Sequence, residues 1–288
     1  MFSRVALFLL FSTSTFATIL PCDKVERWRQ TALLKKLSQA ALATEASSGD
    51  AFAQFFIASL YLGGKGVTKD ESVGVWWLQQ SAKNGFSRAQ LVLGQGYETG
   101  KLLPQDTADA LNWYTKAAEQ RDCEAELFLG LHYLGHHFDM EDNSWNYKGP
   151  KDTAKAIFWL QRAAGRGDPD AQVELGQLYE DGEGVVQDYG TAVFWYREAA
   201  NHGPDLGGAG QGRSRLGNLY FDGRGVPKDY VEAYKWFALA GHKAEEQVAT
   251  RMNQSELKEG KRRVEDWRQR HALEVREADK VFARANSE

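Results

Sequence analysis

The stretch YEDGEGVVQDYGTAVFWYREAA, residues 179–200, decides the fold because its landmarks recur along the chain. Tyr179 precedes Trp195 by 16 residues, and two glycines and Asp188 lie between them. The tyrosine–tryptophan pairs are Tyr61/Trp77, Tyr97/Trp113, Tyr133/Trp159, Tyr179/Trp195 and Tyr220/Trp236. Within a pair, the tryptophan follows the tyrosine by 16 residues in four cases and by 26 in the third. From each of the first three tryptophans to the tyrosine of the next pair the distance is 20 residues. A repeat of 36 residues results, and such a period determines the architecture.

Small residues recur at fixed distances from these landmarks. Alanine or glycine stands three residues before each tyrosine, at Ala58, Gly94, Gly130, Gly176 and Gly217. Two small residues follow each tryptophan by four and five positions, as in Ala117 and Ala118. Spacings of three and four place these residues and the aromatic ones on one face of a helix. We therefore expect two helices in each repeat, packed closely at the small residues, with the tyrosine and tryptophan filling the space beside them.

A turn separates the two expected helices. The sequences YLGGKGVTKD, YEDGEGVVQD and YFDGRGVPKD share two glycines and a final aspartate, which is Asp70, Asp188 or Asp229. Glycine readily adopts the left-handed conformation that ends many helices, and aspartate is a preferred N-cap of the next helix. A helix–turn–helix unit of this length cannot bury its own apolar face, so consecutive units must stack. The sequence predicts an all-α fold, a right-handed α-solenoid of about five repeats.

The pattern of Leu-Ala/Gly, Tyr-x-x-Gly-x-Gly-Val, Asp, Ala-x-x-Trp and Ala-Ala resembles the Sel-one-like repeat (SLR) family, which is tetratricopeptide-repeat-like. The resemblance covers residues 50–243. The second repeat lacks the second turn glycine, in YETGKLLPQD, and the third lacks the turn altogether. The resemblance implies a scaffold that assembles envelope complexes or recognises a secreted partner.

The segments outside the repeats complete the expected domain organisation. Residues 18–49 predict an N-terminal capping helix and residues 244–288 a C-terminal one, because a solenoid needs its terminal apolar faces covered. Insertions interrupt the repeats near 135–151 and 203–212. The second insertion, GPDLGGAGQG, follows a helix and lacks a Lys-Ser/Thr sequence, so we interpret it as a linker rather than a phosphate loop.

Residues 1–17 have the features of a secretory signal peptide. MFSR supplies a positive charge, VALFLLF is apolar, and Thr15 and Ala17 occupy the small positions before the cleavage site. The apolar run is shorter than the ~20 residues that cross a bilayer, so we expect no membrane span. The mature protein is expected in the periplasm or outside the cell. Cys22 also allows a lipoprotein interpretation, which Pro21 disfavours because a small residue is expected before a lipidated cysteine.

Composition restricts the class of partner. The chain has 35 basic and 39 acidic residues, a formal net charge of -4, and therefore no electrostatic tendency to bind nucleic acid or an anionic membrane. Its content of 43% hydrophobic and 26% charged residues is typical of a folded protein. Cys22 and Cys123 are its two cysteines. Whether they pair in a disulfide bond stays open, because about two repeats separate them.

The stretch LHYLGHHFDMEDNSWNYKGPKD, residues 131–152, gathers histidines and carboxylates. His132 and His136 are four residues apart, and two such histidines on one helix can share a zinc ion with a carboxylate. The expected helix ends at Gly135, however, and no zinc motif is present, so we interpret the stretch as a polar surface loop without a metal or cofactor.

No residue pattern predicts catalysis. Serine, cysteine and histidine lack a recognisable nucleophile setting. Some SLR proteins are described as β-lactamases or penicillin-binding proteins, and those resemble chains whose repeats each carry a cysteine pair. This chain has no such pairs. We therefore expect that it is not an enzyme.

The first helix of each repeat is expected to line the inner curve of the solenoid. The centre of its outward face is apolar in the first three repeats, at Phe56, Val92 and Phe128, whereas the outward positions of the last two repeats are polar and charged. An apolar stripe that core packing does not require predicts a ligand groove. The alternative for Phe52 and Phe56 is coverage by the N-terminal helix. We predict partner contacts at Val92, Phe128 and Leu131.

The insertion of the third repeat begins where the helix of Phe128 and Leu131 ends. Phe138, Trp145 and Tyr147 are aromatic side chains of the kind that anchor interfaces. We therefore predict an exported adaptor that binds a protein partner through the groove and this insertion. A narrower version, which the family resemblance suggests, is an immunity protein against a toxin delivered to the periplasm. The alternative is an enzyme or binder acting on cell-wall peptide or glycan.

Overall fold

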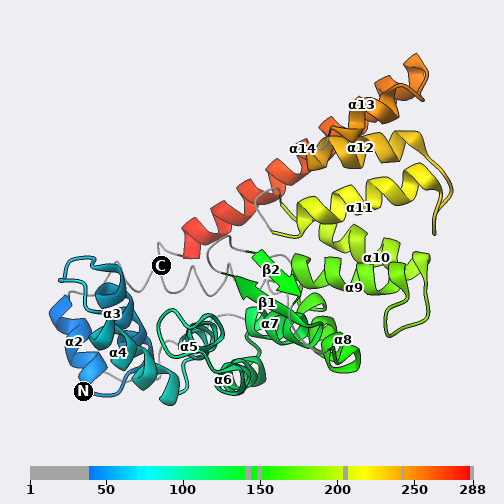
Figure 1. Ribbon diagram of the computed structural model, residues 1–288. Helices are drawn as coiled ribbons and strands as arrows, with labels where there is room; N and C mark the ends of the chain where they lie inside the picture. The colour runs from blue at the N-terminus through cyan, green and yellow to red at the C-terminus, as the bar shows by residue number, and fades with distance from the viewer. Residues whose placement is uncertain (1–38, 140–143, 148–150, 204–206, 242, 286–288) are drawn as a thin grey trace.

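The computed structural model describes residues 39–139, 144–147, 151–203, 207–241 and 243–285. Their helices stack in pairs along a curved path, which is the predicted α-solenoid (Figure 1). The signal peptide predicted at 1–17 lies outside the described residues, as does most of the N-terminal cap predicted at 18–49.

Five helix pairs form the repeats. They are α3 (Ala51–Gly63) with α4 (Glu71–Lys83), α5 (Ser87–Thr99) with α6 (Thr107–Glu119), α7 (Cys123–Tyr133) with α8 (Thr153–Ala164), α9 (Pro169–Asp181) with α10 (Tyr189–Ala200), and α11 (Ala209–Asp222) with α12 (Tyr230–Ala240). The helix α2 (Gln39–Ser47) precedes them, and α13 (Ala244–Ala249) and α14 (Gln254–Ala285) follow. The all-α prediction is confirmed for the repeats. One difference is a small β-hairpin, β1 (His136–Asp139) and β2 (Ser144–Tyr147), in the insertion of the third repeat.

The turn chemistry is as predicted. The side chains of Asp70, Asp188 and Asp229 each accept hydrogen bonds from backbone N–H groups in the first turn of the second helix. Gly182 ends α9 with a φ of 71°, in the left-handed region. The N-capping aspartate also donates its own N–H to the carbonyl oxygen of the repeat's tyrosine, so each turn is closed from both sides.

The landmark aromatic residues pack at the edge of the core, beside the closely packed helices. Only Trp236, with an exposed fraction of 3%, is buried among the ten landmarks. The other nine are half-buried and lie against the buried apolar clusters. They are the tryptophans Trp77, Trp113, Trp159 and Trp195 and the tyrosines Tyr61, Tyr97, Tyr133, Tyr179 and Tyr220.

The residue that follows each tryptophan is buried between the two helices of its repeat. These residues have exposed fractions of 0 to 3% and are Leu78, Tyr114, Leu160, Tyr196 and Phe237. Successive residues of a helix point about 100° apart, so a tryptophan beside such a residue is turned toward the rim of the repeat. The tryptophan recurs unchanged, whereas the buried position that follows it varies among leucine, tyrosine and phenylalanine.

Close packing within each pair depends on the small residues. A Cβ atom on Gly94 would lie 2.4 Å from the ring of Tyr114, and one on Gly176 would lie 2.5 Å from the ring of Tyr196. A Cβ atom on Gly130 would lie 2.6 Å from the Leu160 side chain. The structure thus shows why glycine recurs at this position.

A buried polar side chain, seven residues before each tyrosine, connects successive repeats. These residues are Gln54, Gln90, Glu126, Gln172 and Arg213. Gln90 Nε2 donates to the carbonyl oxygen of Ala82 at 3.0 Å, and Gln172 Nε2 donates to that of Ala164 at 3.1 Å. Each bond supplies a partner to a carbonyl at the end of the preceding helix, which the helix itself leaves unsatisfied.

The third repeat preserves this connection with other residues. Glu126 is fully buried and, as a carboxylate, cannot donate. Instead, Arg162 Nη2 donates to the carbonyl oxygen of Ala118 at 3.3 Å, while its Nε donates to Glu126 Oε1 at 2.9 Å. Burial raises the pKa of Glu126, and the nearby Arg166 and Arg162 oppose this effect.

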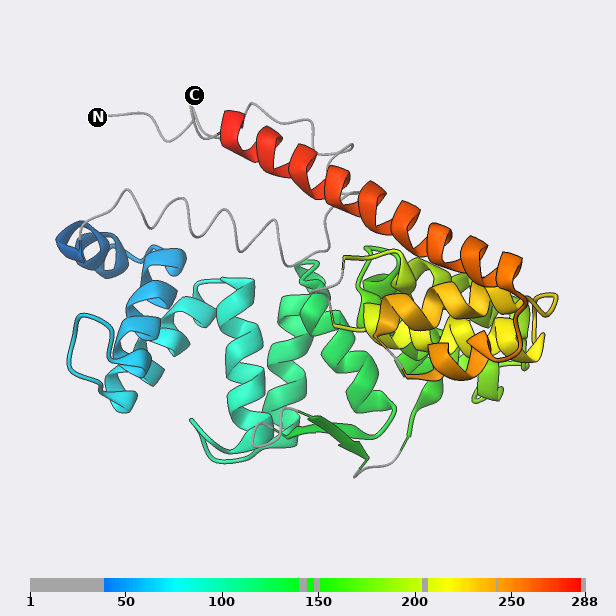
Figure 2. The same cartoon turned by 90° about the horizontal axis from the view of Figure 1, so that it is seen from above.

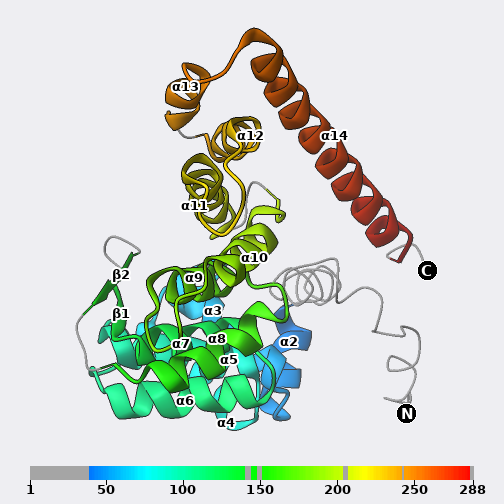
Figure 3. The same cartoon turned by 90° about the vertical axis from the view of Figure 1, so that its right-hand side faces the viewer.

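The first helices lie on the inner side of the curve, as predicted. Helix α9 contacts both α7 and α11, whereas no two second helices of the described repeats make comparable contacts. Figures 2 and 3 show the curved stack from two further directions.

The C-terminal segment differs from the single capping helix that the sequence predicts. It forms two helices, α13 and α14. Val264 and Trp267, both buried, lie in the part of α14 that packs on α12. Beyond them α14 continues clear of the repeats (Figures 1 and 3). Among the described helices, none is long and apolar enough to cross a membrane.

Candidate functional site

The predicted inner stripe is mostly closed. Phe128 and Leu131 have exposed fractions of 6% and 4% and belong to the core shared by the second, third and fourth repeats. Phe128 meets Tyr114 edge-on, with ring centroids 5.5 Å apart. The premise that these two residues form an open apolar stripe is therefore wrong. Val92, on α5, is half-buried and packs against a core cluster.

The N-terminal part of the stripe is also covered. Phe56 packs against a cluster that contains Ala46 of α2, which agrees with the alternative that a preceding helix covers it. Phe52 meets Phe86 edge-on, with ring centroids 5.8 Å apart. Neither residue therefore forms a free apolar surface.

Charged residues occupy outward positions of the inner helices. Arg88 of α5 donates to the carboxylate of Glu124 on α7, which joins two neighbouring first helices. On α9, burial and the nearby Asp170 raise the pKa of Glu174 to about 7, and Arg215 opposes the shift. The inner face is polar where the sequence predicted it to be, in the fourth and fifth repeats.

The insertion places three predicted contact residues in the hairpin. Strands β1 and β2 are antiparallel, with Phe138 opposite Trp145 and His136 opposite Tyr147. Directly opposed residues and those two apart share a face of a ladder. The register therefore puts the three aromatic residues and His136 on one face. Strand β1 contacts α5 and α7, which places the hairpin beside the inner helices.

The two histidines considered as zinc ligands lie on different elements. His132 is in α7, and His136 begins β1 after the helix has ended. His132 Nδ1 lies 4.0 Å from Glu98 Oε1, and Glu98 Oε2 accepts a hydrogen bond of 2.6 Å from the Tyr114 hydroxyl. In the described part of the chain, no three histidine, cysteine or acidic residues are grouped to hold a metal ion. Cys123 is a buried free thiol, and Cys22 lies outside the described residues.

A second candidate site lies where α14 packs on the last repeat. This C-terminal pocket has a volume of about 690 Å³. Its lining residues are Arg197, Asn201, Tyr220, Asp229, Glu232, Lys235, Trp236, Trp267, Arg270 and His271. They come from α10, α11, α12 and α14 and from the residues that cap α10 and α12, so the pocket exists only when the terminal helix is docked.

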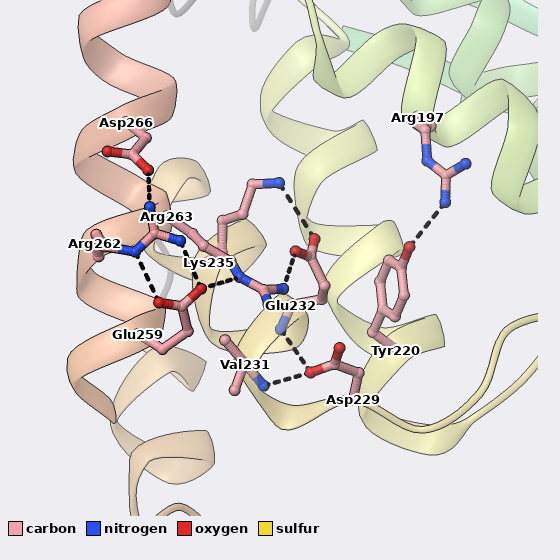
Figure 4. Close-up of polar contacts among 10 residues, drawn as sticks. All are labelled: Arg197, Tyr220, Asp229, Val231, Glu232, Lys235, Glu259, Arg262, Arg263 and Asp266. Atoms are coloured by element: carbon pink, nitrogen blue, oxygen red, sulfur yellow. Dashed lines mark hydrogen bonds and ion pairs between the residues drawn. The ribbon is translucent and has the colours of Figure 1, made fainter. Parts of the chain in front are cut away.

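Ion pairs hold the wall of the C-terminal pocket together (Figure 4). Glu232 lies between Lys235, at 3.2 Å, and Arg263 of α14, at 2.6 Å. Burial lowers the pKa of Lys235, and Glu232 partly offsets this effect. Glu232 therefore fixes both a pocket cation and the position of α14.

Aromatic rings form the rest of the pocket wall. Trp267 stacks on His271, with ring centroids 4.2 Å apart and planes 13° apart. Lys235 Nζ lies 4.0 Å from the centroid of the Trp236 ring. The sequence predicts a capping helix within residues 244–288, but it does not indicate which repeat residues Trp267 and His271 contact. Such a mixture of aromatic faces and cations suits binding rather than bond-breaking chemistry.

A family model described as Sel1 repeat matches residues 51–86, 87–122, 124–168, 169–204 and 211–243. These segments coincide with the five helix pairs. A comparison with the curated proteins gives no match.

Solved structures share the fold. A protective antigen present in uropathogenic Escherichia coli strains, which displays an SLR fold, is 31% identical with a TM-score of 0.63. That match covers 74% of this chain but only 42% of the antigen. A Sel1 repeat protein from Oxalobacter formigenes is 28% identical with a TM-score of 0.59, over 75% of this chain and 81% of that one. An immunity protein from Pseudomonas aeruginosa, 17% identical with a TM-score of 0.41 over 78% and 82% of the two chains, is too distant to carry an argument about function.

Proposed function

The chain belongs to the Sel1 repeat family, and from this premise we propose that it is an adaptor whose protein partner binds at the hairpin of the third repeat. Proteins built from Sel1 repeats are generally scaffolds for protein interaction, and the fold is typically not enzymatic. The proposal assigns the partner contacts of this chain to specific residues.

The hairpin register carries this proposal. Phe138, Trp145 and Tyr147 fall on one face of the ladder. Aromatic residues are enriched at interface hot spots because they bury a large area with little loss of conformational freedom. Strand β1 contacts α7 and also α5, the helix that carries Val92. We propose these four residues as the contact surface, which we call the hairpin surface.

The hairpin is an addition to a turn that all five repeats share. The other four repeats close the same turn with a short loop, and the third closes it with the same backbone hydrogen bond despite ten additional residues. A segment that adds aromatic residues without serving the fold is best explained by recognition.

A pair of matched variants tests the site. Trp145→Ala/Tyr147→Ala removes two rings from the hairpin surface. Phe158→Ala/Phe194→Ala removes two rings that are each 52% exposed on second helices, and it serves as the control. In affinity capture from a periplasmic extract, wild type and control should recover the same protein, and the hairpin variant should recover at least about tenfold less. Equal recovery by all three forms would show that the partner binds elsewhere. A Phe128→Asp variant is unsuitable, because Phe128 is a core residue.

We further propose that the protein is exported and acts in the periplasm, on the features of residues 1–17. Intact mass of the protein made in a bacterial host should then correspond to a chain that begins at Thr18. A chain that retains residues 1–17 in the cytoplasm would contradict export.

The narrower proposal is immunity against a toxin delivered to the periplasm. Its test is protection of cells that express the chain with and without residues 1–17, challenged by a toxin encoded beside it. Protection that requires the export segment would support immunity, and survival equal to that of cells lacking the chain would reject it.

A further inference from the structure

We propose that the C-terminal pocket binds a carboxylate group of an acidic peptide segment. This inference rests on the proposed function only in taking a protein as the partner. It concerns a surface formed by α10, α11, α12 and α14, which is separate from the hairpin surface on β1, β2 and α5.

Two pocket arginines have donors to offer a ligand. Arg197 donates from Nη2 to the Tyr220 hydroxyl oxygen at 2.8 Å (Figure 4). Arg270 donates from Nε to the backbone carbonyl oxygen of Asp266 at 3.3 Å. Among the residues up to 272, whose side chains the structure describes, neither arginine has a carboxylate ion-pair partner. A guanidinium has five N–H donors in a planar fork that matches a carboxylate, so most of their donors are available.

A buried donor in the same pocket points to the same ligand. Trp236 lines the pocket with an exposed fraction of 3%, and its indole N–H has no acceptor among the described residues. Buried polar groups in proteins nearly always have a hydrogen-bond partner. Indole is a donor only, so the partner must bring an acceptor oxygen.

The acidic residues of the pocket are already engaged. Asp229 Oδ1 accepts from the backbone N–H groups of Val231 and Glu232, at 2.8 and 3.0 Å. Glu232 is paired with Lys235 and with Arg263. These two carboxylates therefore leave the donors of Arg197, Arg270 and Trp236 unused.

The charge of the pocket favours a single carboxylate over a phosphate dianion. Its lining contains three cationic side chains, Arg197, Lys235 and Arg270, and two acidic ones, Asp229 and Glu232. The formal charge of the lining is therefore +1 with histidine neutral. One negative charge complements it, whereas a second would meet the fixed carboxylates.

The size and the walls of the pocket favour a peptide. A volume of about 690 Å³ is in the range of small-ligand pockets. The rings of Trp236 and Trp267 offer an apolar surface to the side chain beside a carboxylate. We therefore expect acidic residues alternating with apolar ones in the segment that binds.

Indole N–H resonances provide a direct test with the full chain. The probe is a hexapeptide of alternating leucine and glutamate, and its leucine–glutamine counterpart is the control. The Trp236 resonance is assigned with a Trp236→Phe variant. Titration with the glutamate peptide should move this resonance, and the glutamine peptide should leave it in place.

A double charge variant and a single control variant locate the site. Arg197→Gln/Arg270→Gln should weaken binding of the glutamate peptide at least about tenfold. Arg268→Gln removes an exposed charge from the same helix outside the pocket, and binding should be unchanged. A Trp145→Ala/Tyr147→Ala variant should bind the peptide normally, so failure of the hairpin proposal and failure of this one are distinguishable.

Several results would overturn the assignment. They are an unmoved Trp236 resonance at millimolar glutamate peptide, equal binding of the glutamine peptide, or equal weakening by Arg268→Gln. A titration with inorganic phosphate tests whether any small anion binds in the pocket. If it moves the resonance as strongly as the peptide does, the pocket binds small anions and the peptide assignment is wrong.

Discussion

The backbone N–H of Asp152 donates to the carbonyl oxygen of Tyr133 at 2.7 Å, across the whole insertion of the third repeat. The equivalent bonds of the other four repeats measure 2.9 to 3.1 Å and close a short turn. The third repeat thus keeps the turn hydrogen bond of the other four repeats, and the hairpin is an addition to a turn that is already closed. The insertion is therefore separate from the turn that the fold requires.

Replacing the hairpin by the short turn of another repeat should leave the fold intact. In this variant residues 135–151 are exchanged for the seven residues 181–187 of the fourth repeat, and the buried Leu134 is kept. The melting temperature should change by no more than about 3 °C, which corresponds to ~1 kcal/mol in a domain of this size. Helicity by circular dichroism should be retained. A loss of cooperative unfolding would show that the hairpin is part of the core.

A methyl group at the close contact of the fourth repeat should destabilise the protein. Gly176→Ala would place Cβ 2.5 Å from the ring of Tyr196, which is fully buried and whose hydroxyl donates to Glu180. We expect the free energy of unfolding, measured by chemical denaturation, to fall by about 1–3 kcal/mol. The control Gly210→Ala lies on a helix with no atom within 4 Å of the added Cβ. It should be neutral or stabilising by up to ~1 kcal/mol. Equal effects of the two changes would contradict the packing argument.

Removing Arg162 should expose the dependence of Glu126 on its partners. In Arg162→Ala the fully buried carboxylate of Glu126 keeps Arg166, at 3.2 Å, as its remaining ion-pair partner in the described structure. We expect the free energy of unfolding to fall by at least about 2 kcal/mol. Adding Glu126→Gln should recover part of the loss, because glutamine at this position bonds the preceding helix in the second and fourth repeats. Urea denaturation of the double-mutant cycle measures the coupling. Strictly additive effects would mean that the pair is not coupled.

Stability should depend on pH through Glu174. Its folded pKa of about 7 exceeds the ordinary value of 4.5, so the folded state binds the proton more tightly than the unfolded state. The resulting stabilisation is fully present below about pH 4.5 and is lost as pH rises through 7. Between pH 4.5 and 7.5 the free energy of unfolding of wild type should fall by up to ~3 kcal/mol relative to that of Glu174→Gln. Urea denaturation at each pH measures both values. A pH-independent difference between the two proteins would contradict the burial of this carboxyl group.

Local patterns explain the part of the fold that could be predicted from the sequence. Tyr179, Gly182 and Asp188 act within one repeat, through a helix end, a positive φ and an N-cap, and their spacing recurs. The polar connection between repeats also had a signal, since a polar residue stands seven positions before each tyrosine. It was not recognised, because its residue types vary.

The recurring tryptophans predicted the period correctly, and the residue after each of them marks the buried centre of the helix pair. Trp77, Trp113 and Trp159 mark three of the second helices, yet each is half-buried beside a fully buried neighbour in the next position. An exact repeat of one residue type therefore located the helices, whereas the burial of each position depended on how the two helices of a pair face each other.

The inner stripe could not be predicted as reliably, because the exposure of a position on a first helix depends on the neighbouring repeats. Phe128 reads as outward by its position in α7, yet Tyr114 of the preceding repeat lies against it. The hairpin was missed for another reason. Its two strands are four residues long, and such short strands give no periodic signal. The C-terminal pocket depends on where α14 docks, which no local pattern specifies.

Site-specific photo-crosslinking tests the adaptor proposal most directly. A photoreactive amino acid replaces Tyr147 in the hairpin or, as the control, Val186, which is 88% exposed in the corresponding turn of the fourth repeat. On irradiation in cells, we expect one discrete cross-linked protein from position 147 and none from position 186, and the product should disappear when Trp145→Ala is added. A product of equal yield from both positions, or from position 186 alone, would contradict binding at the hairpin surface.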